Sequence, residues 1–173
     1  HHLVDFVVRG EGEKTLVELA DCFRNGRAYT DVKGISYKDD QGEVVHNPDR
    51  PFLDMNEIGI LPYDLVDLKK YPLEKTGFPL NTSRGCPYPC KFCYNLTYNK
   101  RKWRSQSPEK VMAAMNHIID EYKIKNFLFQ VDDEFFINQK RVEKICTQIV
   151  DQKLDIEWSS FNRADLLARY STE

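Results

Sequence analysis

Two amphipathic helices that alternate with apolar strands occupy the second half of the sequence, and they restrict its fold more than any other feature. The helices are expected near residues 107–122 and 138–150, where apolar side chains recur at the spacing of one buried helix face. Ser107 and Asn138 suit the N-cap positions of these helices. The accompanying strands are expected at residues 78–83, 126–131 and 155–160. Strands that alternate with helices in this way predict right-handed βαβ units and a parallel sheet.

The first 76 residues follow a different pattern. The expected elements are a strand at residues 3–9, a helix at 14–25, and a hairpin with strands at 34–37 and 43–46. Residues 47–76 contain four prolines and little periodicity, which is typical of a connecting segment with one helical turn near residues 63–68. The sequence opens abruptly on a strand and its first Met is Met55, so we expect a piece of a longer protein. His1-His2 are either native or the remnant of a purification tag.

Net charge and hydropathy argue against several classes of function. The 173-residue chain has a formal charge of −2 and no block of like charges, so electrostatics gives no reason to invoke nucleic acid or a membrane surface. No apolar stretch approaches the roughly 20 residues that span a bilayer, and no secretory leader is present. Five cysteines, an odd number with three inside eight residues, do not resemble a disulfide framework. This clustering indicates metal in a reducing compartment, and the expected location is the cytoplasm.

The three clustered cysteines are the main candidates for chemistry. Cys86, Cys90 and Cys93 share one short loop, and three thiolates favour a soft metal centre, zinc or iron–sulfur. A structural zinc site needs four ligands, usually in two pairs. Cys22 and Cys146 lie on or beside apolar helix faces, where a buried small hydrophobe is the expected role. Three ligands leave one iron of a four-iron cluster open, so spacing alone favours iron–sulfur, with zinc and unrelated thiols as alternatives.

The spacing of these cysteines resembles the signature of the radical S-adenosylmethionine superfamily. A gap of three residues is followed by a gap of two, with Phe92 immediately before the last cysteine. The resemblance implies a [4Fe-4S] cluster held by Cys86, Cys90 and Cys93, after the first strand of a partial (β/α) barrel, an incomplete TIM-like fold. It also implies that S-adenosylmethionine chelates the open iron through its amino and carboxylate groups. Phe92 would border the adenine through its backbone.

The flanking segments resemble the cobalamin-binding class of this superfamily. The segments that carry the likeness are residues 4–13, the hairpin, residues 61–65, residues 132–135, Trp158 and Arg163. The resemblance implies that residues 1–30 end a Rossmann-like cobalamin-binding domain with its last βα unit, that 31–76 form a β-hairpin linker, and that 77–173 begin the partial barrel. The Asp-x-His-x-x-Gly motif that supplies a cobalt ligand in many relatives would lie before residue 1.

Four charged residues are further candidates for the cofactor site. Asp132, Asp133 and Glu134 follow a buried strand at the carboxyl edge, where α/β sheets bind ligands. The resemblance implies that this trio holds the amino group of S-adenosylmethionine, and a carboxylate facing an ammonium suits that role. The alternative is a solvated turn. Arg163 would pair with the cofactor carboxylate, or else it is a surface arginine.

The resemblance also implies the reaction. The family cleaves S-adenosylmethionine reductively to methionine and a 5′-deoxyadenosyl radical, which abstracts hydrogen from a substrate carbon. With cobalamin the outcome is C-methylation, so a methyltransferase is a leading possibility, and other relatives rearrange or cyclise. A small-molecule or natural-product substrate and a reducing partner such as flavodoxin or ferredoxin are expected. The alternative is a non-catalytic zinc- or iron–sulfur-binding module, and a part of a barrel that does not turn over alone is a further possibility.

Overall fold

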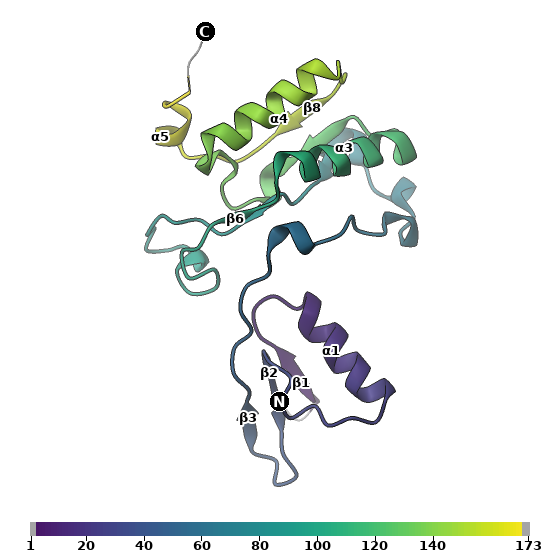
Figure 1. The fold of residues 1–173 in the computed structure, drawn as a ribbon, viewed down its shortest axis with the longest axis vertical. Coiled ribbons are helices and arrows are strands. Elements are labelled where there is room, and N and C mark those ends of the chain that lie inside the picture. Colours follow the sequence, from purple (N-terminus) through teal and green to yellow (C-terminus); the bar gives the residue numbers. More distant parts are fainter. Residues whose placement is uncertain (1–2, 171–173) are drawn as a thin grey trace. The chain divides into compact units, whose positions relative to one another are not determined.

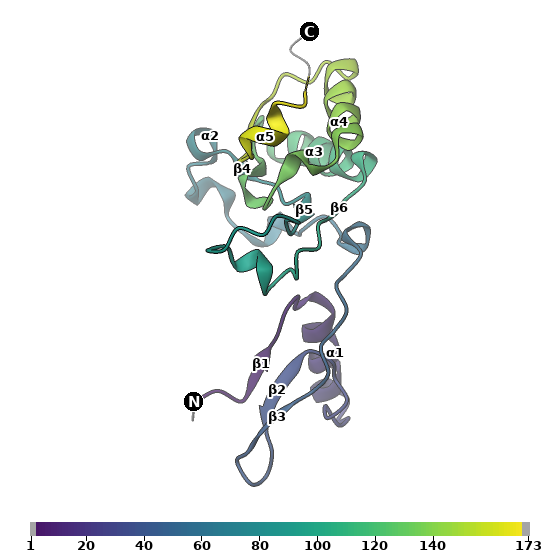
Figure 2. The same cartoon turned by 90° about the vertical axis from the view of Figure 1, so that its left-hand side faces the viewer.

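The computed structural model of the chain describes residues 3–170, so the question about His1-His2 lies outside the described residues. The chain divides into two compact units between Leu53 and Asp54. Figures 1 and 2 show the elements of each unit. None of the helices within residues 3–170 combines the length and apolarity needed to cross a bilayer.

The first unit is a three-stranded antiparallel sheet with one helix. Its elements are β1 (Phe6–Val8), α1 (Glu13–Arg24), β2 (Ile35–Lys38) and β3 (Val44–His46). The predicted strand, helix and hairpin are therefore all present. The strand order is β1-β2-β3, and Val7 of β1 lies opposite Ser36 of β2. Leu19 and Cys22 of α1 are buried together with Ile35, so the helix covers the sheet with its apolar face.

The pairing of β1 with the hairpin was not expected from the sequence. A boundary at residue 30 separates β1 and α1 from the hairpin, whereas the structure joins all three strands in one sheet that belongs to a unit ending at Leu53. A three-residue strand needs a partner, and the nearest strand along the chain supplies an antiparallel one. The membership of residues 1–30 in a cobalamin-binding domain stays a prediction.

The second unit contains the predicted parallel sheet. Its strands are β4 (Phe78–Pro79), β7 (Asn126–Leu128) and β8 (Glu157–Ser159), in the order β4-β7-β8. Phe127 lies opposite both Phe78 and Trp158, and both pairings are parallel. The mixed α/β fold with a parallel sheet is thus confirmed, while closure into a partial barrel stays a prediction.

Two long helices connect the parallel strands. They are α3 (Pro108–Tyr122) and α4 (Gln139–Asp151), which contact each other (Figure 1). The predicted N-caps are confirmed: Ser107 Oγ accepts from Lys110 N at 3.3 Å, and Asn138 Oδ1 accepts from Arg141 N at 3.1 Å. The buried side chains of the common core include Phe78, Phe127, Phe129, Phe135, Val111, Met115, Ile118, Val142 and Ile145. A single apolar core therefore fixes the helices against the sheet.

Two of the predicted strands end early and are followed by a different element. Residues 78–83 do not form one strand, because β4 ends at Pro79 and a separate strand β5 (Ser83–Arg84) pairs antiparallel with β6 (Arg104–Ser105). Residues 126–131 form β7 and then the 3-10 helix η5 (Phe129–Val131). The other short helices are η1 (Met55–Glu57), η2 (Tyr63–Leu65), η3 (Leu68–Lys70), α2 (Leu73–Thr76), η4 (Tyr94–Leu96), η6 (Phe135–Ile137) and α5 (Ala164–Leu167).

Candidate functional site

The loop between β5 and β6 carries the three clustered cysteines, and we call residues 85–103 the cysteine loop. Cys86, Cys90 and Cys93 are partly buried free thiols. The backbone turns between the last two, since Cys93 N donates to Cys90 O at 3.0 Å. Of the other two thiols, Cys22 is buried in the first unit and Cys146 packs against the core of the second. These two positions match the small hydrophobes expected from the sequence.

A glycine lets the chain enter the cysteine loop. Gly85 has φ +85°, and a Cβ added to it would lie 2.0 Å from the carbonyl oxygen of Lys102. Two backbone segments therefore cross here too closely for any side chain, and only glycine fits. The Gly85 N–H donates to Asp133 Oδ2 at 2.6 Å. The start and the end of the cysteine loop are thus brought together at this point.

Asp133 holds the cysteine loop in place by hydrogen bonds. Its carboxylate accepts hydrogen bonds from Asn95 Nδ2 at 2.9 Å, from Asn99 Nδ2 at 3.3 Å and from the Tyr94 hydroxyl. Burial and then the hydrogen bond to Asp133 raise the pKa of Tyr94, which stays a neutral donor. Sequence reasoning missed Asn95 and Asn99, whose four-residue spacing was the available signal. The Asp133 carboxylate, which was expected to bind a cofactor, is engaged with the cysteine loop.

Asp132 holds the strand that leads to the cysteines. The residue is 2% exposed. Its carboxylate accepts from Thr82 N at 2.6 Å, Thr82 Oγ1 at 2.5 Å, Ser83 N at 2.9 Å, Ser83 Oγ at 2.8 Å and Asn81 Nδ2 at 3.1 Å. Burial raises the pKa of Asp132, and the bonds from Thr82 and Ser83 oppose that rise. These contacts draw residues 82–83 away from the parallel sheet, which explains why β4 and β5 are separate.

A buried arginine lies behind this carboxylate. Arg141 Nη2 donates to Thr82 Oγ1 at 2.8 Å, and its Nε donates to the Gln106 carbonyl oxygen at 2.8 Å. The guanidinium carbon also lies 5.3 Å from the centre of the Phe135 ring. Burial lowers the pKa of Arg141 to about 10, while the charge of Asp132 opposes that change. The Thr82 hydroxyl thus links a buried carboxylate to a buried guanidinium.

Glu134 is the member of the acidic trio whose charge reaches the cysteines. It is 2% exposed, and its carboxylate accepts from Arg163 N at 2.9 Å and from Phe136 N at 3.2 Å. Burial raises the pKa of Glu134. Burial also raises the pKa of the Cys86 thiol, and the Glu134 charge adds to that effect. A carboxylate of raised pKa beside a thiol cluster is typical of a functional site.

Arg163 lies beside the cysteine loop. Its Nη1 is 3.7 Å from Cys90 Sγ, and its Cζ is 3.9 Å from the centre of the Tyr88 ring. Its Nε donates to Asp165 Oδ1 at 3.0 Å. Phe92 belongs to the same loop, and its side chain is 95% exposed. The structure therefore brings Cys90, Arg163 and Glu134 together and leaves the Phe92 ring in solvent.

The donor atoms of the cysteine loop suit an iron–sulfur cluster in kind. Three soft sulfurs share one loop, and N–H groups of Arg163 and Asn95 lie within 3.7 Å of two of them. Within residues 3–170, no group of three or more His, Cys, Asp or Glu side chains is arranged to hold a metal ion. The assignment of Cys86, Cys90 and Cys93 as ligands stays a prediction, supported by donor chemistry.

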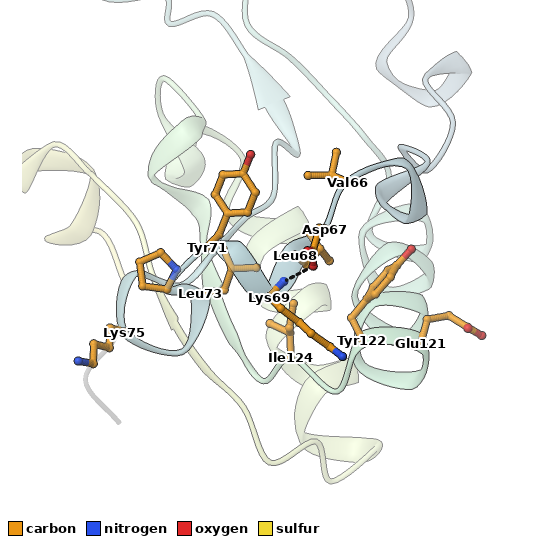
Figure 3. A pocket seen from close by; sticks show the side chains of 11 residues that line it. Val66, Asp67, Leu68, Lys69, Tyr71, Leu73, Lys75, Glu121, Tyr122 and Ile124 are labelled. Atoms are coloured by element: carbon orange, nitrogen blue, oxygen red, sulfur yellow. Dashed lines mark hydrogen bonds between the residues drawn. The ribbon is translucent and has the colours of Figure 1, made fainter.

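A pocket lies away from this site. Figure 3 shows a hollow of about 660 Å³, lined by Tyr71, Leu73, Tyr122 and Ile124 among others. Leu73 precedes β4 and Ile124 precedes β7, so the pocket opens at the amino ends of the parallel strands. The acidic trio follows β7 and therefore lies at the opposite, carboxyl edge. The predicted site residues and this pocket therefore lie at opposite ends of the parallel strands.

Known proteins resemble this chain over nearly its whole length. It is 39% identical over 164 residues to an uncharacterized methyltransferase of Pyrococcus horikoshii, covering 94% of this chain and 35% of that protein. It is 27% identical over 172 residues to the anaerobic magnesium-protoporphyrin IX monomethyl ester cyclase of Rubrivivax gelatinosus, covering 96% of this chain and 31% of that enzyme. The chain thus spans about a third of the length of these curated relatives. A comparison with models of protein families gives no match.

Solved structures carry the same fold. The cobalamin-dependent S-adenosylmethionine radical enzyme OxsB, with aqua-cobalamin and S-adenosylmethionine bound, has a TM-score of 0.76 at 27% identity, over 96% of this chain and 24% of OxsB. The radical S-adenosylmethionine methyltransferase TsrM from Kitasatospora setae has a TM-score of 0.67 at 22% identity, over 86% of this chain and 29% of TsrM, a likeness of fold. The chain is therefore related to the cobalamin-dependent radical S-adenosylmethionine enzymes, and it fits a fragment of that superfamily. The relationship to this superfamily that the cysteine motif predicted is confirmed.

Proposed function

We propose that this chain is the cluster-bearing part of a radical S-adenosylmethionine enzyme, with Cys86, Cys90 and Cys93 as the ligands of a [4Fe-4S] cluster. The observation that carries the proposal is the cysteine loop itself, a loop of three thiols closed at Gly85 and fastened by Asp133. A structural loop of this size has no need of three partly buried thiols with N–H donors close to two of them. The likeness to OxsB, whose structure holds cobalamin and S-adenosylmethionine, points to the same class.

When bound, the cluster and S-adenosylmethionine supply one-electron chemistry that cleaves the sulfonium reductively and yields a 5′-deoxyadenosyl radical. The residues of this chain bind and orient. Glu134 lies at the carboxyl edge and is the member of the trio that we assign to the amino group of S-adenosylmethionine, because it binds the backbone of Arg163, whose side chain approaches Cys90. Arg163 remains a candidate for the cofactor carboxylate, and the backbone of Phe92 for the adenine edge.

The names of two relatives support a more specific proposal for the reaction. One relative is named as a methyltransferase and another as a cyclase, so cobalamin-dependent C-methylation is the first candidate and ring formation the second. The substrate class is a small molecule or natural product, and the electron donor a reducing partner such as flavodoxin or ferredoxin. We propose a cytoplasmic location, where thiols stay reduced. Residues supplied by the rest of the longer protein complete the substrate site.

Anaerobic reconstitution of the 173-residue chain with iron and sulfide tests the cluster. We expect a brown chromophore with near-equimolar cluster by iron and sulfide analysis. Cys86→Ala, Cys90→Ala or Cys93→Ala abolishes it, whereas Cys22→Ala and Cys146→Ala retain it. Stoichiometric zinc in place of iron would instead support the non-catalytic zinc module, and equal losses in all five variants would remove the assignment.

A binding measurement separates the members of the acidic trio. In the reconstituted chain, Glu134→Gln is expected to weaken S-adenosylmethionine binding while iron content stays unchanged, because it removes the negative charge that we assign to the ammonium group. Asp133→Asn is the matched variant next to it in sequence, and its loss should appear first in iron content, since Asp133 fastens the loop. Unchanged cofactor affinity in Glu134→Gln would return that carboxylate to a purely structural role.

A further inference from the structure

Two of the three cysteine sulfurs have a side-chain N–H donor beside them. Arg163 Nη1 is 3.7 Å from Cys90 Sγ, and Asn95 Nδ2 is 3.7 Å from Cys93 Sγ. Both distances are within the range of N–H···S hydrogen bonds, which are longer than N–H···O bonds because sulfur is larger. Arg163 is distant in sequence from the cysteine it approaches, so the fold itself creates this contact.

The Arg163 guanidinium is fixed in place by contacts on several sides. Asp165 accepts from its Nε at 3.0 Å, and the guanidinium carbon stacks 3.9 Å above the Tyr88 ring. The backbone N–H of the same residue is bound to Glu134 at 2.9 Å. These contacts orient Nη1 toward Cys90 without any help from a ligand. A positive charge is thereby built into the wall of the cysteine loop.

The Asn95 amide is fixed in a different way. The residue is 3% exposed, its Nδ2 also donates to Asp133 Oδ1 at 2.9 Å, and its Oδ1 accepts from Asn99 Nδ2 at 2.6 Å. Because Oδ1 is used as an acceptor from Asn99, the amide cannot turn over, and Nδ2 must face Asp133 and Cys93. The donor at this sulfur is neutral and buried.

The two donors differ in charge. The cation of Arg163 lies beside Cys90, whereas the neutral amide of Asn95 lies beside Cys93. This difference matters for a redox centre, because hydrogen bonds to ligand sulfurs and nearby charges set its reduction potential.

We infer that Arg163 and Asn95 are positioning residues that raise the reduction potential of the cluster by donating hydrogen bonds to Cys90 and Cys93. The inference rests on the proposed function and goes beyond it, since it assigns Arg163 to a cysteine sulfur in addition to a cofactor carboxylate. One-electron reduction adds negative charge that spreads onto the ligand sulfurs. A fixed cation and a fixed N–H dipole stabilise that added charge, and Arg163 has the larger effect because it carries a full charge.

The test is a redox titration of the reconstituted 173-residue chain, with dithionite as reductant and the electron paramagnetic resonance signal of the reduced cluster as readout. Arg163→Met should shift the midpoint potential to a more negative value, and Arg163→Lys should shift it less because the charge remains. The matched control is Arg101→Met. Arg101 lies in the same loop and donates to the Pro87 carbonyl oxygen at 3.0 Å, and no contact of its side chain with a sulfur is found among the described residues.

A second pair of variants tests the neutral donor. Asn95→Ala removes the N–H donor beside Cys93. Asn99→Ala keeps that donor and removes the hydrogen bond that orients the Asn95 amide. We expect a negative shift for Asn95→Ala that exceeds the shift for Asn99→Ala. Iron content and unfolding curves of each variant establish that the cluster and the fold are retained.

The outcomes of these titrations are distinguishable. A parent chain that takes up no cluster refutes the proposed function. A parent chain with a cluster, whose potential changes no more in Arg163→Met than in Arg101→Met, refutes this inference and leaves the proposed function standing. Loss of the cluster in Arg163→Met would assign the arginine to cluster retention and would also overturn the redox role.

Discussion

Replacing Asp132 by alanine should destabilise the second unit more than any single surface change. The substitution removes the acceptor of five hydrogen bonds and leaves the donors of Thr82 and Ser83 buried without it. It also removes the nearest negative charge from the buried Arg141 guanidinium. Breaking a buried charge network on one side costs about 3–5 kcal/mol. A domain is stable by roughly 5–15 kcal/mol, so the loss is a large share of the total.

The assay follows from where the tryptophans lie. The sequence contains two, Trp103 and Trp158, and both belong to the unit that begins at Asp54. Urea unfolding followed by tryptophan fluorescence therefore reports on this unit, without a contribution from the first. The matched control is Asp155→Ala, in the same unit, where the side chain is 91% exposed and pairs only with Lys125 among the described residues. We expect the control to change the unfolding midpoint little.

A double-mutant cycle tests the reasoning behind this magnitude. Arg141→Met should cost less stability in the Asp132→Ala background than in the parent, because the guanidinium has already lost its counter-charge. Residues in one charge network typically couple by about 0.5–3 kcal/mol. Additive losses would show that the two charges do not support each other through Thr82. An Asp132→Ala midpoint equal to that of Asp155→Ala would contradict the whole account.

Three further predictions follow from the fold. Gly85→Ala should be more destabilising than Gly77→Ala, because both glycines have positive φ, which costs about 1–3 kcal/mol for another residue, while only Gly85 meets a backbone atom at 2.0 Å; equal urea midpoints would refute the crossing. A hydrogen bond from Lys144 lowers the pKa of Glu109 to about 2, so this carboxylate stabilises the fold above its ordinary pKa of 4.5 and the contribution is lost as pH falls toward 2; Glu109→Gln should flatten the acid side of the stability curve, and an unchanged curve would contradict this. Equilibrium dialysis with hydroxocobalamin should reveal no saturable site on this chain, because one short antiparallel sheet with one helix provides no nucleotide-type crevice; saturable binding would show that the crevice is already present.

The local features of the fold and its parallel βαβ pattern could be predicted from the sequence, whereas side-chain contacts between residues far apart in the chain could not. Ser107 and Asn138 cap their helices as expected, because a cap depends on residues within one turn. The separation of β4 from β5 depends on Asp132, about fifty residues along the chain from Thr82 and Ser83. No periodicity within residues 78–83 contains that information.

The candidate site also has features that could be predicted from the sequence and features that could not. The three cysteines were identified by their spacing, and the location of the acidic trio at the carboxyl edge by its place after a buried strand. The separate roles of the trio were not predictable, because they depend on which partner each carboxylate meets in three dimensions. Asp132 meets Thr82, Asp133 meets the cysteine loop, and Glu134 meets the backbone of Arg163.

The two edges of the parallel sheet differ in their ability to pair with a further strand. Leu80 N donates to Leu128 O at 3.2 Å, and backbone groups of successive strand residues point to opposite sides, so the nitrogen of Pro79 faces the outer side of β4. Proline has no N–H, and the outer side of this strand therefore lacks the donor that a new strand would need. On β8, Glu157 N donates inward to Lys125 O at 2.9 Å, which turns the N–H of Trp158 outward. A further parallel strand is thus favoured beside β8 and disfavoured beside β4, so we expect any extension of this sheet on the β8 side.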